Sequence, residues 1–396
     1  MNFNGFSDCL GQNVKNAMKQ ILDRKIATGC GIMIGRGGKL CYEAYAGYAD
    51  KERQIPTTKD TVYRMYSTTK LVTVVAALQL WEKSAFSMLD PLYMFIPEFK
   101  DMMIQDESGL RKAQNPILIK HLFTMTAGLS YDDEYGNYRA LAEKWLNAKA
   151  NGNNWDTLKA AKEIAKLPLA FEPGEHFRYS FCLDILGALI EIWSGKRFDV
   201  YCKEHIFKPL GMNNTSFDLN DLERKNLAQV YTPSENGLKI TSGINNPAID
   251  ASLDFENVSF FSGGAGLLST LEDYFKFACM LASGGTYNGV RILGSRTIEY
   301  MHTPQLNEVQ LKDYRNGDHC CFGYSYSYGL GVRVLIENHT SQYVPVGEWG
   351  WSGALGTWVH IDPKEDLFYV YVHQRTPADH DLYIPFLDAA IYSSLE

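Results

Sequence analysis

Strand-like segments at both ends of this 396-residue chain enclose a long helical middle, and this order restricts the possible folds most. Residues 29–50 contain two β-leaning runs on either side of Gly35-Arg36-Gly37-Gly38, which is the pattern of a hairpin. Beyond about residue 320, Gly, Asn or Asp-Pro breaks separate three more short runs: "YGLGVRVLIE", "TWVHIDP" and "LFYVYVHQR". The two ends therefore predict one sheet that both termini complete.

The middle of the chain, from about residue 70 to 230, has the apolar spacing of helices. One clear helix begins near Leu71, and another, "DILGALIEIWSG", would be closed by Gly195 as a C-cap. We therefore predict an α/β (α+β-like) fold, in which a mostly helical subdomain (81–229) is inserted into an α/β domain (1–80 plus 230–396). The strict strand–helix alternation of a Rossmann fold or a TIM barrel is missing from the sequence.

Charge and cysteine content argue against several classes of protein. The formal net charge is −8 and no stretch is basic, so neither nucleic acid nor an anionic membrane is expected as a partner. The eight cysteines are scattered without a C-x-x-C pair, as reduced thiols are. No signal peptide is recognisable, and the apolar run Leu71–Trp81 is too short to span a bilayer. We expect a soluble cytoplasmic protein without a membrane span, and the sequence leaves its oligomeric state open.

The nine histidines show no H-E-x-x-H or other paired ligand spacing, so we expect no metal and no cofactor. The glycine-rich segment Gly263-Gly264-Ala265-Gly266 lacks the lysine and the strand–loop–helix setting of a phosphate-binding loop. It is interpreted as a tight turn before a helix that begins near Thr270.

Ser67-Thr68-Thr69-Lys70 stands directly before the long apolar helix and is the only S-x-x-K pattern in the chain. An alcohol is a poor nucleophile until a neighbouring base removes its proton. Residues i and i+3 share one face of a helix, so Lys70 would hold its amine within reach of the Ser67 hydroxyl. The motif alone leaves a second interpretation open, in which Ser67 only caps the start of a core helix.

The blocks around this motif decide between the two interpretations. They are "GKLCYEAYAGYAD", "TKDTVYRMYSTTK", "IKHLFTMTAGLSYD", "FEPGEHFRYSFCLDILGALIE", "FKPLGMNNTSF", "SGGAGLLSTLEDYFKFACMLASGG" and "YGLGVRV". In this order along the chain, they resemble the serine β-lactamase-like family, which contains class C β-lactamases, D-alanyl-D-alanine carboxypeptidases and family VIII-type carboxylesterases and acyltransferases. The resemblance implies the serine β-lactamase/DD-peptidase fold, an antiparallel sheet flanked by helices, with Ser67 as the nucleophile and Lys70 as its base.

The second motif of the family is Y-x-N, whose tyrosine activates the serine and protonates the leaving group. Tyr135-Gly136-Asn137 matches literally, but the family's surrounding pattern P-G-x-x-F-x-Y-S fits Tyr179 instead. The resemblance thus implies that Tyr179 is catalytic and that Phe181 replaces the asparagine; the alternative is a half-buried aromatic residue at a helix entrance. Phenylalanine cannot donate the hydrogen bond by which that asparagine holds the amide side chain of β-lactams and peptides.

The third motif, K-T-G or H-T-G, is absent, and Trp351-Ser352-Gly353 takes its place. The esterase and acyltransferase branch is similar in often having W-x-G here. Tryptophan would form an apolar wall where a cation would bind a carboxylate, although a buried core tryptophan remains the alternative. By family position, the N–H groups of Ser67 and Ala354 would form the oxyanion hole, and Tyr66, Phe181, Trp351, Ser352 and Gly353 would contact substrate.

Together these residues predict a serine hydrolase that cleaves small-molecule esters or amides through an acyl-enzyme, with a carboxylesterase favoured. Phe181 and Trp351 both remove polar groups that would bind a carboxylated peptide-like substrate or a lactam. The alternatives are a class C-like β-lactamase, a D-alanyl-D-alanine peptidase or an acyltransferase, and a non-catalytic binding or sensing module on the same fold.

Overall fold

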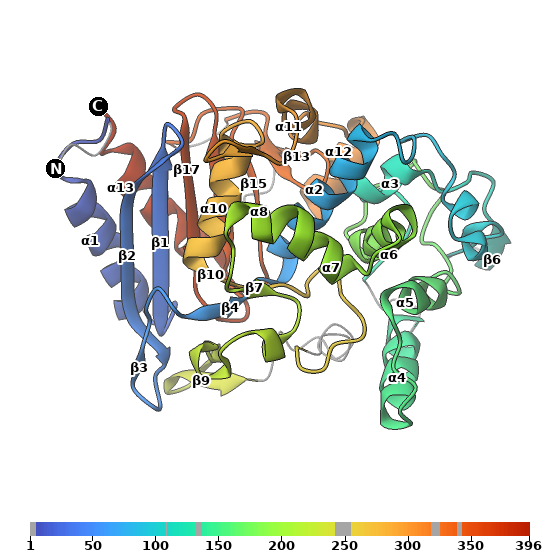
Figure 1. The fold of residues 1–396 in the computed structure, drawn as a ribbon, viewed down its shortest axis with the longest axis horizontal. Helices are drawn as coiled ribbons and strands as arrows, with labels where there is room; N and C mark the ends of the chain where they lie inside the picture. Colours follow the sequence, from blue (N-terminus) through green and yellow to red (C-terminus); the bar gives the residue numbers. More distant parts are fainter. Residues whose placement is uncertain (1–4, 108, 132–136, 242–254, 318–324, 339–342) are drawn as a thin grey trace.

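An eight-stranded sheet lies on one side of the protein in the computed structural model, at the left in Figure 1. The structure describes residues 5–107, 109–131, 137–241, 255–317, 325–338 and 343–396. The strand order is β13-β14-β15-β16-β17-β1-β2-β3, and neighbouring strands run antiparallel. The strands are β1 (Gly29–Arg36), β2 (Lys39–Asp50), β3 (Ile55–Pro56), β13 (Tyr326–Tyr328), β14 (Arg333–Leu335), β15 (Trp349–Ser352), β16 (Trp358–Asp362) and β17 (Leu367–Val372).

The last strand, β17, lies between β16 and the first strand, β1, so both ends of the chain complete one sheet. This arrangement confirms the predicted fold class. The predicted hairpin is also present: β1 and β2 pair from Arg36↔Lys39 inward, and Gly37 and Gly38 between them have φ values of 61° and 67°. Glycine adopts this left-handed conformation at the lowest cost, which makes the tight turn possible.

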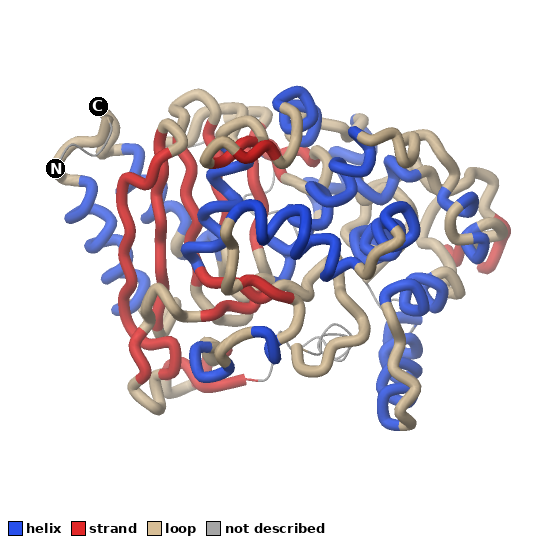
Figure 2. The backbone as a smooth tube through the Cα atoms, in the orientation of Figure 1, coloured by secondary structure: helices blue, strands red, loops and turns tan. Residues whose placement is uncertain are grey.

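Helices cover both faces of the sheet (Figure 2). Phe368 of β17 stacks on Phe275 of α10 with ring centroids 4.9 Å apart, whereas the hydroxyl of Tyr369 donates to Asp388 of α13 over 2.7 Å. Successive side chains of a strand point to opposite faces, so α10 and α13 lie on opposite sides of the sheet. The helices are α1 (Leu10–Asp23), α2 (Thr69–Glu82), α3 (Ile119–Phe123), α4 (Asn137–Ala150), α5 (Thr157–Ile164), α6 (Cys182–Ser194), α7 (Phe198–Cys202), α8 (Lys208–Leu210), α10 (Leu271–Ala282), α11 (Ser295–Met301), α12 (Glu308–Asn316) and α13 (Ile384–Tyr392).

The helix α2 runs through the centre of the molecule, and every residue from Thr69 to Leu80 is buried. A helix that is apolar all round is typical of a core helix, as its sequence predicts. It packs against α6, which Gly195 ends in a left-handed conformation with φ 68°. Within the described ranges, no helix is long and apolar enough to cross a membrane.

Four small sheets complete the part of the chain that the structure describes. The strand β10 (Leu268–Thr270) pairs with β4 (Val62–Arg64) and with β7 (Thr215–Ser216), so parts of the predicted helical insert and of the predicted α/β domain share a sheet. The remaining pairs are β5 (Met103–Asp106) with β6 (Gly109–Lys112), β8 (Val230–Ser234) with β9 (Gly237–Thr241), and β11 (Thr286–Tyr287) with β12 (Val290–Arg291). The boundaries 81–229 and 1–80 plus 230–396 stay a prediction.

Candidate active site

Ser67 lies in a short 3-10 turn, Tyr66–Thr68, that joins β4 to α2. The residue before it, Tyr66, has a φ of 45°, which is uncommon for a residue other than glycine. Tyr66 is buried and packs with Val230, Ala265 and Leu355, and this packing holds the unusual backbone in place. The turn leaves Ser67 partly exposed while the residues on either side of it are buried.

Lys70 lies in the first turn of α2 and is 1% exposed. Its Nζ is 3.2 Å from Ser67 Oγ and donates to the carbonyl oxygen of Gly264 over 2.7 Å. It also lies over the ring of Tyr179, 4.6 Å from the centroid. The i, i+3 spacing therefore brings the two polar groups together as the sequence predicts.

A buried carboxylate holds the backbone to which Lys70 binds. Asp184 of α6 accepts hydrogen bonds from the Gly264 N–H over 3.1 Å and from the Ser262 hydroxyl over 2.5 Å. The Tyr131 hydroxyl donates to the other carboxylate oxygen over 3.3 Å. Burial raises the pKa of Asp184, and the Ser262 hydrogen bond and the charge of Lys70 oppose that rise.

No motif of the sequence predicts Asp184, although an acidic residue inside the apolar segment "DILGALIEIW" is a signal that could have found it. The Gly263–Gly264 segment does form a turn, but it does more than lead into a helix. A Cβ on Gly264 would lie 2.7 Å from Asp184 Oδ2, so glycine permits the close approach that places its carbonyl on Lys70.

Tyr179 and Trp351 are buried together beside Lys70. The indole Nε1–H of Trp351 donates to the Tyr179 hydroxyl oxygen over 3.2 Å, and their ring centroids are 5.6 Å apart. Tyr328 of β13 also packs edge-on with the indole, at a centroid distance of 5.1 Å. Trp351 thus gives more than the expected apolar wall: an indole N–H can only donate, so the Tyr179 proton must point to another acceptor.

Phe181 directly precedes α6 and is 8% exposed. Its ring meets Tyr131 edge-on at 4.6 Å and stacks on Tyr138 of α4 at 4.8 Å. An aromatic cluster therefore stands where the Y-x-N motif would have an amide. Of the literal match to that motif, Tyr135 and Gly136 lie outside the described residues, and Asn137 is the first residue of α4.

Trp351 and Ser352 end β15, Gly353 follows the strand, and β15 lies against the turn that carries Ser67. A Cβ on Gly353 would lie 2.4 Å from the Met65 carbonyl oxygen and 2.1 Å from Thr357 Oγ1. The close approach expected at Gly353 is therefore made to the backbone before Ser67. Ala354 follows, is half-buried, and packs with the cluster around Tyr66.

Neither the N–H of Ser67 nor that of Ala354 donates a hydrogen bond to any residue that the structure describes. Both belong to backbone segments that meet where Gly353 approaches Met65. Free backbone donors are what an oxyanion hole requires, and this role of the two N–H groups stays a prediction. The described residues contain no group of three or more His, Cys, Asp or Glu side chains that could bind a metal ion.

This sheet, completed by both termini and bordered by helices, is the fold of serine β-lactamases and penicillin-binding proteins. The model of the family described as Beta-lactamase matches residues 14–391, so the chain belongs to the β-lactamase family.

Several known proteins are similar to the chain over much of its length. Protein Rv1367c of Mycobacterium tuberculosis (strain H37Rv) is 29% identical over 91% of this chain and 89% of its own length. Esterase EstB of Burkholderia gladioli is 27% identical over 65% of this chain and 66% of its own. The structure titled "EstCE1, a hydrolase with promiscuous acyltransferase activity" superposes with a TM-score of 0.81 at 23% identity, covering 97% of this chain and 98% of its own.

Proposed function

We propose that the protein is a carboxylesterase that cleaves small-molecule esters through an acyl-enzyme on Ser67. The observation that carries the proposal is the buried Lys70 amine, placed 3.2 Å from Ser67 Oγ and fixed from behind by the Gly264 carbonyl. A serine with a positioned base is the requirement for nucleophilic catalysis. The similarity to esterase EstB supports the same class of reaction.

In this proposal Ser67 Oγ attacks the ester carbonyl carbon, and its proton passes to the amine nitrogen of Lys70. The carbonyl oxygen becomes an oxyanion, which the N–H groups of Ser67 and Ala354 bind. The bond to the alcohol then breaks, and Tyr179 gives its proton to the departing oxygen. Water then attacks the acyl-enzyme and gives one proton to the Tyr179 oxygen. As the bond to Ser67 breaks, Lys70 returns its extra proton to Ser67 Oγ, and the acid is released.

Two contacts favour a neutral ester over a β-lactam or a D-peptide. The indole of Trp351 binds the Tyr179 oxygen and carries no charge with which to pair a substrate carboxylate. Phe181 is packed between Tyr131 and Tyr138 and offers no hydrogen bond for an amide. A chromogenic cephalosporin is therefore expected to be turned over far more slowly than a p-nitrophenyl ester.

The test is steady-state hydrolysis of p-nitrophenyl butyrate. We expect Ser67→Ala to abolish turnover, while Ser393→Ala, the same change at an exposed position of the C-terminal segment, leaves kcat/KM unchanged. Turnover that survives in Ser67→Ala would contradict the proposal. If wild-type protein shows no turnover and a fluorophosphonate fails to label Ser67, the non-catalytic alternative is correct.

Acyl transfer to an alcohol is the second candidate, because EstCE1 is described as a hydrolase with promiscuous acyltransferase activity. The two reactions share the acyl-enzyme and differ only in whether water or an alcohol accepts the acyl group. Adding butan-1-ol to the assay distinguishes them, since acyl transfer produces the butyl ester in proportion to the alcohol.

A further inference from the structure

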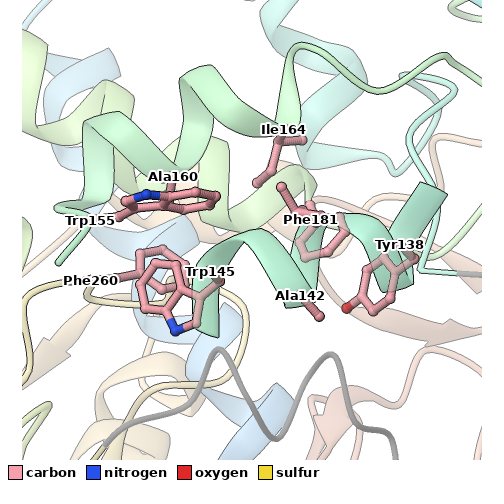
Figure 3. Close-up of a pocket in the computed structure, with 9 residues that line it drawn as sticks. Tyr138, Ala142, Trp145, Trp155, Ala160, Ile164, Phe181 and Phe260 are labelled. Carbon is pink, nitrogen blue, oxygen red and sulfur yellow. The ribbon is translucent and has the colours of Figure 1, made fainter. Parts of the chain in front are cut away.

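A pocket lined by apolar and aromatic side chains lies between α4, α5 and the residue that precedes α6 (Figure 3). The empty space inside it, counted together with the solvent at its open mouth, is about 370 Å³. No charged side chain lines it. The lining residues are Tyr138, Leu141, Ala142, Trp145, Trp155, Ala160, Ile164, Phe181 and Phe260.

The sequence builds the pocket from one face of each helix. Tyr138, Leu141, Ala142 and Trp145 recur at helical spacing on α4, so their side chains share one side. Trp145 meets both Trp155, in an edge-to-face contact at 5.1 Å, and Phe260, at 5.2 Å. These rings are nearly buried and fix the far end of the pocket.

Phe181, in the wall of the pocket, is linked to the candidate catalytic residues by ring contacts. Its ring lies 4.6 Å from that of Tyr131, which lies 5.7 Å from the ring of Tyr179. Lys70 Nζ is 5.8 Å from the centroid of the same Tyr131 ring. A single aromatic ring therefore separates the pocket wall from the proposed base.

We propose that this pocket binds an apolar alkyl or aryl chain of the ester substrate. The inference rests on the proposed esterase function and adds a substrate class to it. An apolar lining without charges stabilises a neutral chain by removing it from water and excludes a charged one. The bound alkyl or aryl chain can belong to the acyl group or to the alcohol of the ester, and two series of ester substrates distinguish these two cases.

The test compares two ester series, p-nitrophenyl esters from acetate to octanoate and alkyl acetates from ethyl to octyl. In Ala142→Phe the pocket is filled, and we expect the long-to-short ratio of kcat/KM to fall about tenfold or more in one series. A fall in the first series assigns the chain to the acyl group, and a fall in the second assigns it to the alcohol. The control Ala140→Phe makes the same change on the exposed side of α4 and leaves both ratios unchanged.

A second variant, Trp155→Phe, enlarges the pocket and moves the best substrate to a longer chain in the same series. Ser67-dependent hydrolysis with unchanged ratios in both variants overturns the pocket assignment and leaves the esterase proposal standing. If no ester is hydrolysed, calorimetry of octanamide binding to the Ser67→Ala protein tests whether the pocket binds an apolar chain. Binding that Ala142→Phe removes in that background supports the pocket, and an absence of binding overturns it.

Discussion

At the scale of single residues, the least expected contact is that of Asp184 with the Gly264 N–H, because it fixes the carbonyl that holds Lys70. We predict that Asp184→Ala lowers kcat for ester hydrolysis about tenfold or more, since small displacements of a catalytic group are costly. It also leaves buried donors without an acceptor, which is expected to cost about 1–3 kcal/mol of unfolding free energy.

Asp184→Asn keeps the shape of the side chain and one acceptor oxygen. Its kcat in the same assay and its unfolding free energy in urea are therefore expected to lie between those of wild type and Asp184→Ala. Asp184 would be a positioning residue, because its carboxylate contacts the Gly264 and Ser262 groups and not Ser67. Wild-type kcat in Asp184→Ala, together with lost stability, would show that the carboxylate only supports the fold.

A substitution at Trp351 tests whether this residue serves only as an apolar wall or also as a hydrogen-bond donor to Tyr179. Trp351→Phe keeps an aromatic wall and removes the N–H that binds the Tyr179 oxygen. Loss of about 1 kcal/mol from one hydrogen bond predicts a roughly fivefold fall in kcat and an altered pH profile. Trp81→Phe, at the far end of α2, is the matched control with unchanged kcat. An equal kcat in both variants would restore the simpler interpretation of an apolar wall.

Short-range patterns predict only part of this site. Ser67 and Lys70 are one helical turn apart, so their contact follows from local geometry. Tyr179 and Trp351 were predicted from resemblance, and their mutual hydrogen bond depends on two segments that meet only after folding. Asp184 and Tyr131 belong to no short motif, and their roles appear only through the buried contacts with Gly264 and Phe181.

At the scale of secondary-structure elements, the end of β15 can pack closely against the Ser67 turn because Gly353 has no side chain. Gly353→Ala would place a Cβ 2.4 Å from the Met65 carbonyl oxygen. We predict a loss of about 2 kcal/mol or more in unfolding free energy and a large fall in kcat/KM. Gly317→Ala is the matched control, because its Cβ meets nothing closer than 3.4 Å. A fully active, stable Gly353→Ala protein would refute this account of the turn.

The helices α4 and α5, which form the pocket, are joined by Glu163, whose side chain is 2% exposed. Lys144 of α4 binds its carboxylate, and Lys159 and Lys166 bind the other oxygen, each at 2.7 Å. Burial alone would raise the pKa of Glu163, but the hydrogen bonds from these lysines outweigh it and lower the pKa from 4.5 to about 2.

A lowered folded-state pKa means that the stabilisation is complete above about pH 4.5 and is lost as pH falls through about 2. We predict that Glu163→Gln is about 2 kcal/mol less stable than wild type at pH 7, and that the difference shrinks between those two pH values. Urea unfolding across this pH range measures the difference in unfolding free energy. Glu98→Gln is the control: Glu98 forms a half-exposed ion pair with Lys162, so its loss is expected to have a small effect. A pH-independent difference would contradict the assigned ion pairs.

Elements were more predictable than the contacts between them. The β1–β2 hairpin, the buried helix α2 and the Gly195 end of α6 follow from turn glycines and apolar periodicity. The pocket was not predictable in this way, because Trp145, Trp155 and Phe260 meet across separate segments. Periodicity reports which face of a helix is buried and not what it packs against.

At the scale of the whole molecule, the candidate site lies where three stretches of the chain meet. Ser67 and Lys70 come from the first strands and α2, Tyr179 and Asp184 from the helical middle, and Trp351 from a late strand of the sheet. Since β17 must pair with β1 to complete the sheet, no stretch can form the site alone. Membership of the β-lactamase family accounts for this arrangement.

The most direct test of the central claim is a chemical trap of the acyl-enzyme. Wild-type protein is mixed with p-nitrophenyl butyrate, quenched in acid within the first turnover, and digested for peptide mass spectrometry. We predict one butyryl group on the Ser67 hydroxyl of the wild-type protein and none in Ser67→Ala. A butyryl group on another residue, or turnover with no adduct in either protein, would contradict the account.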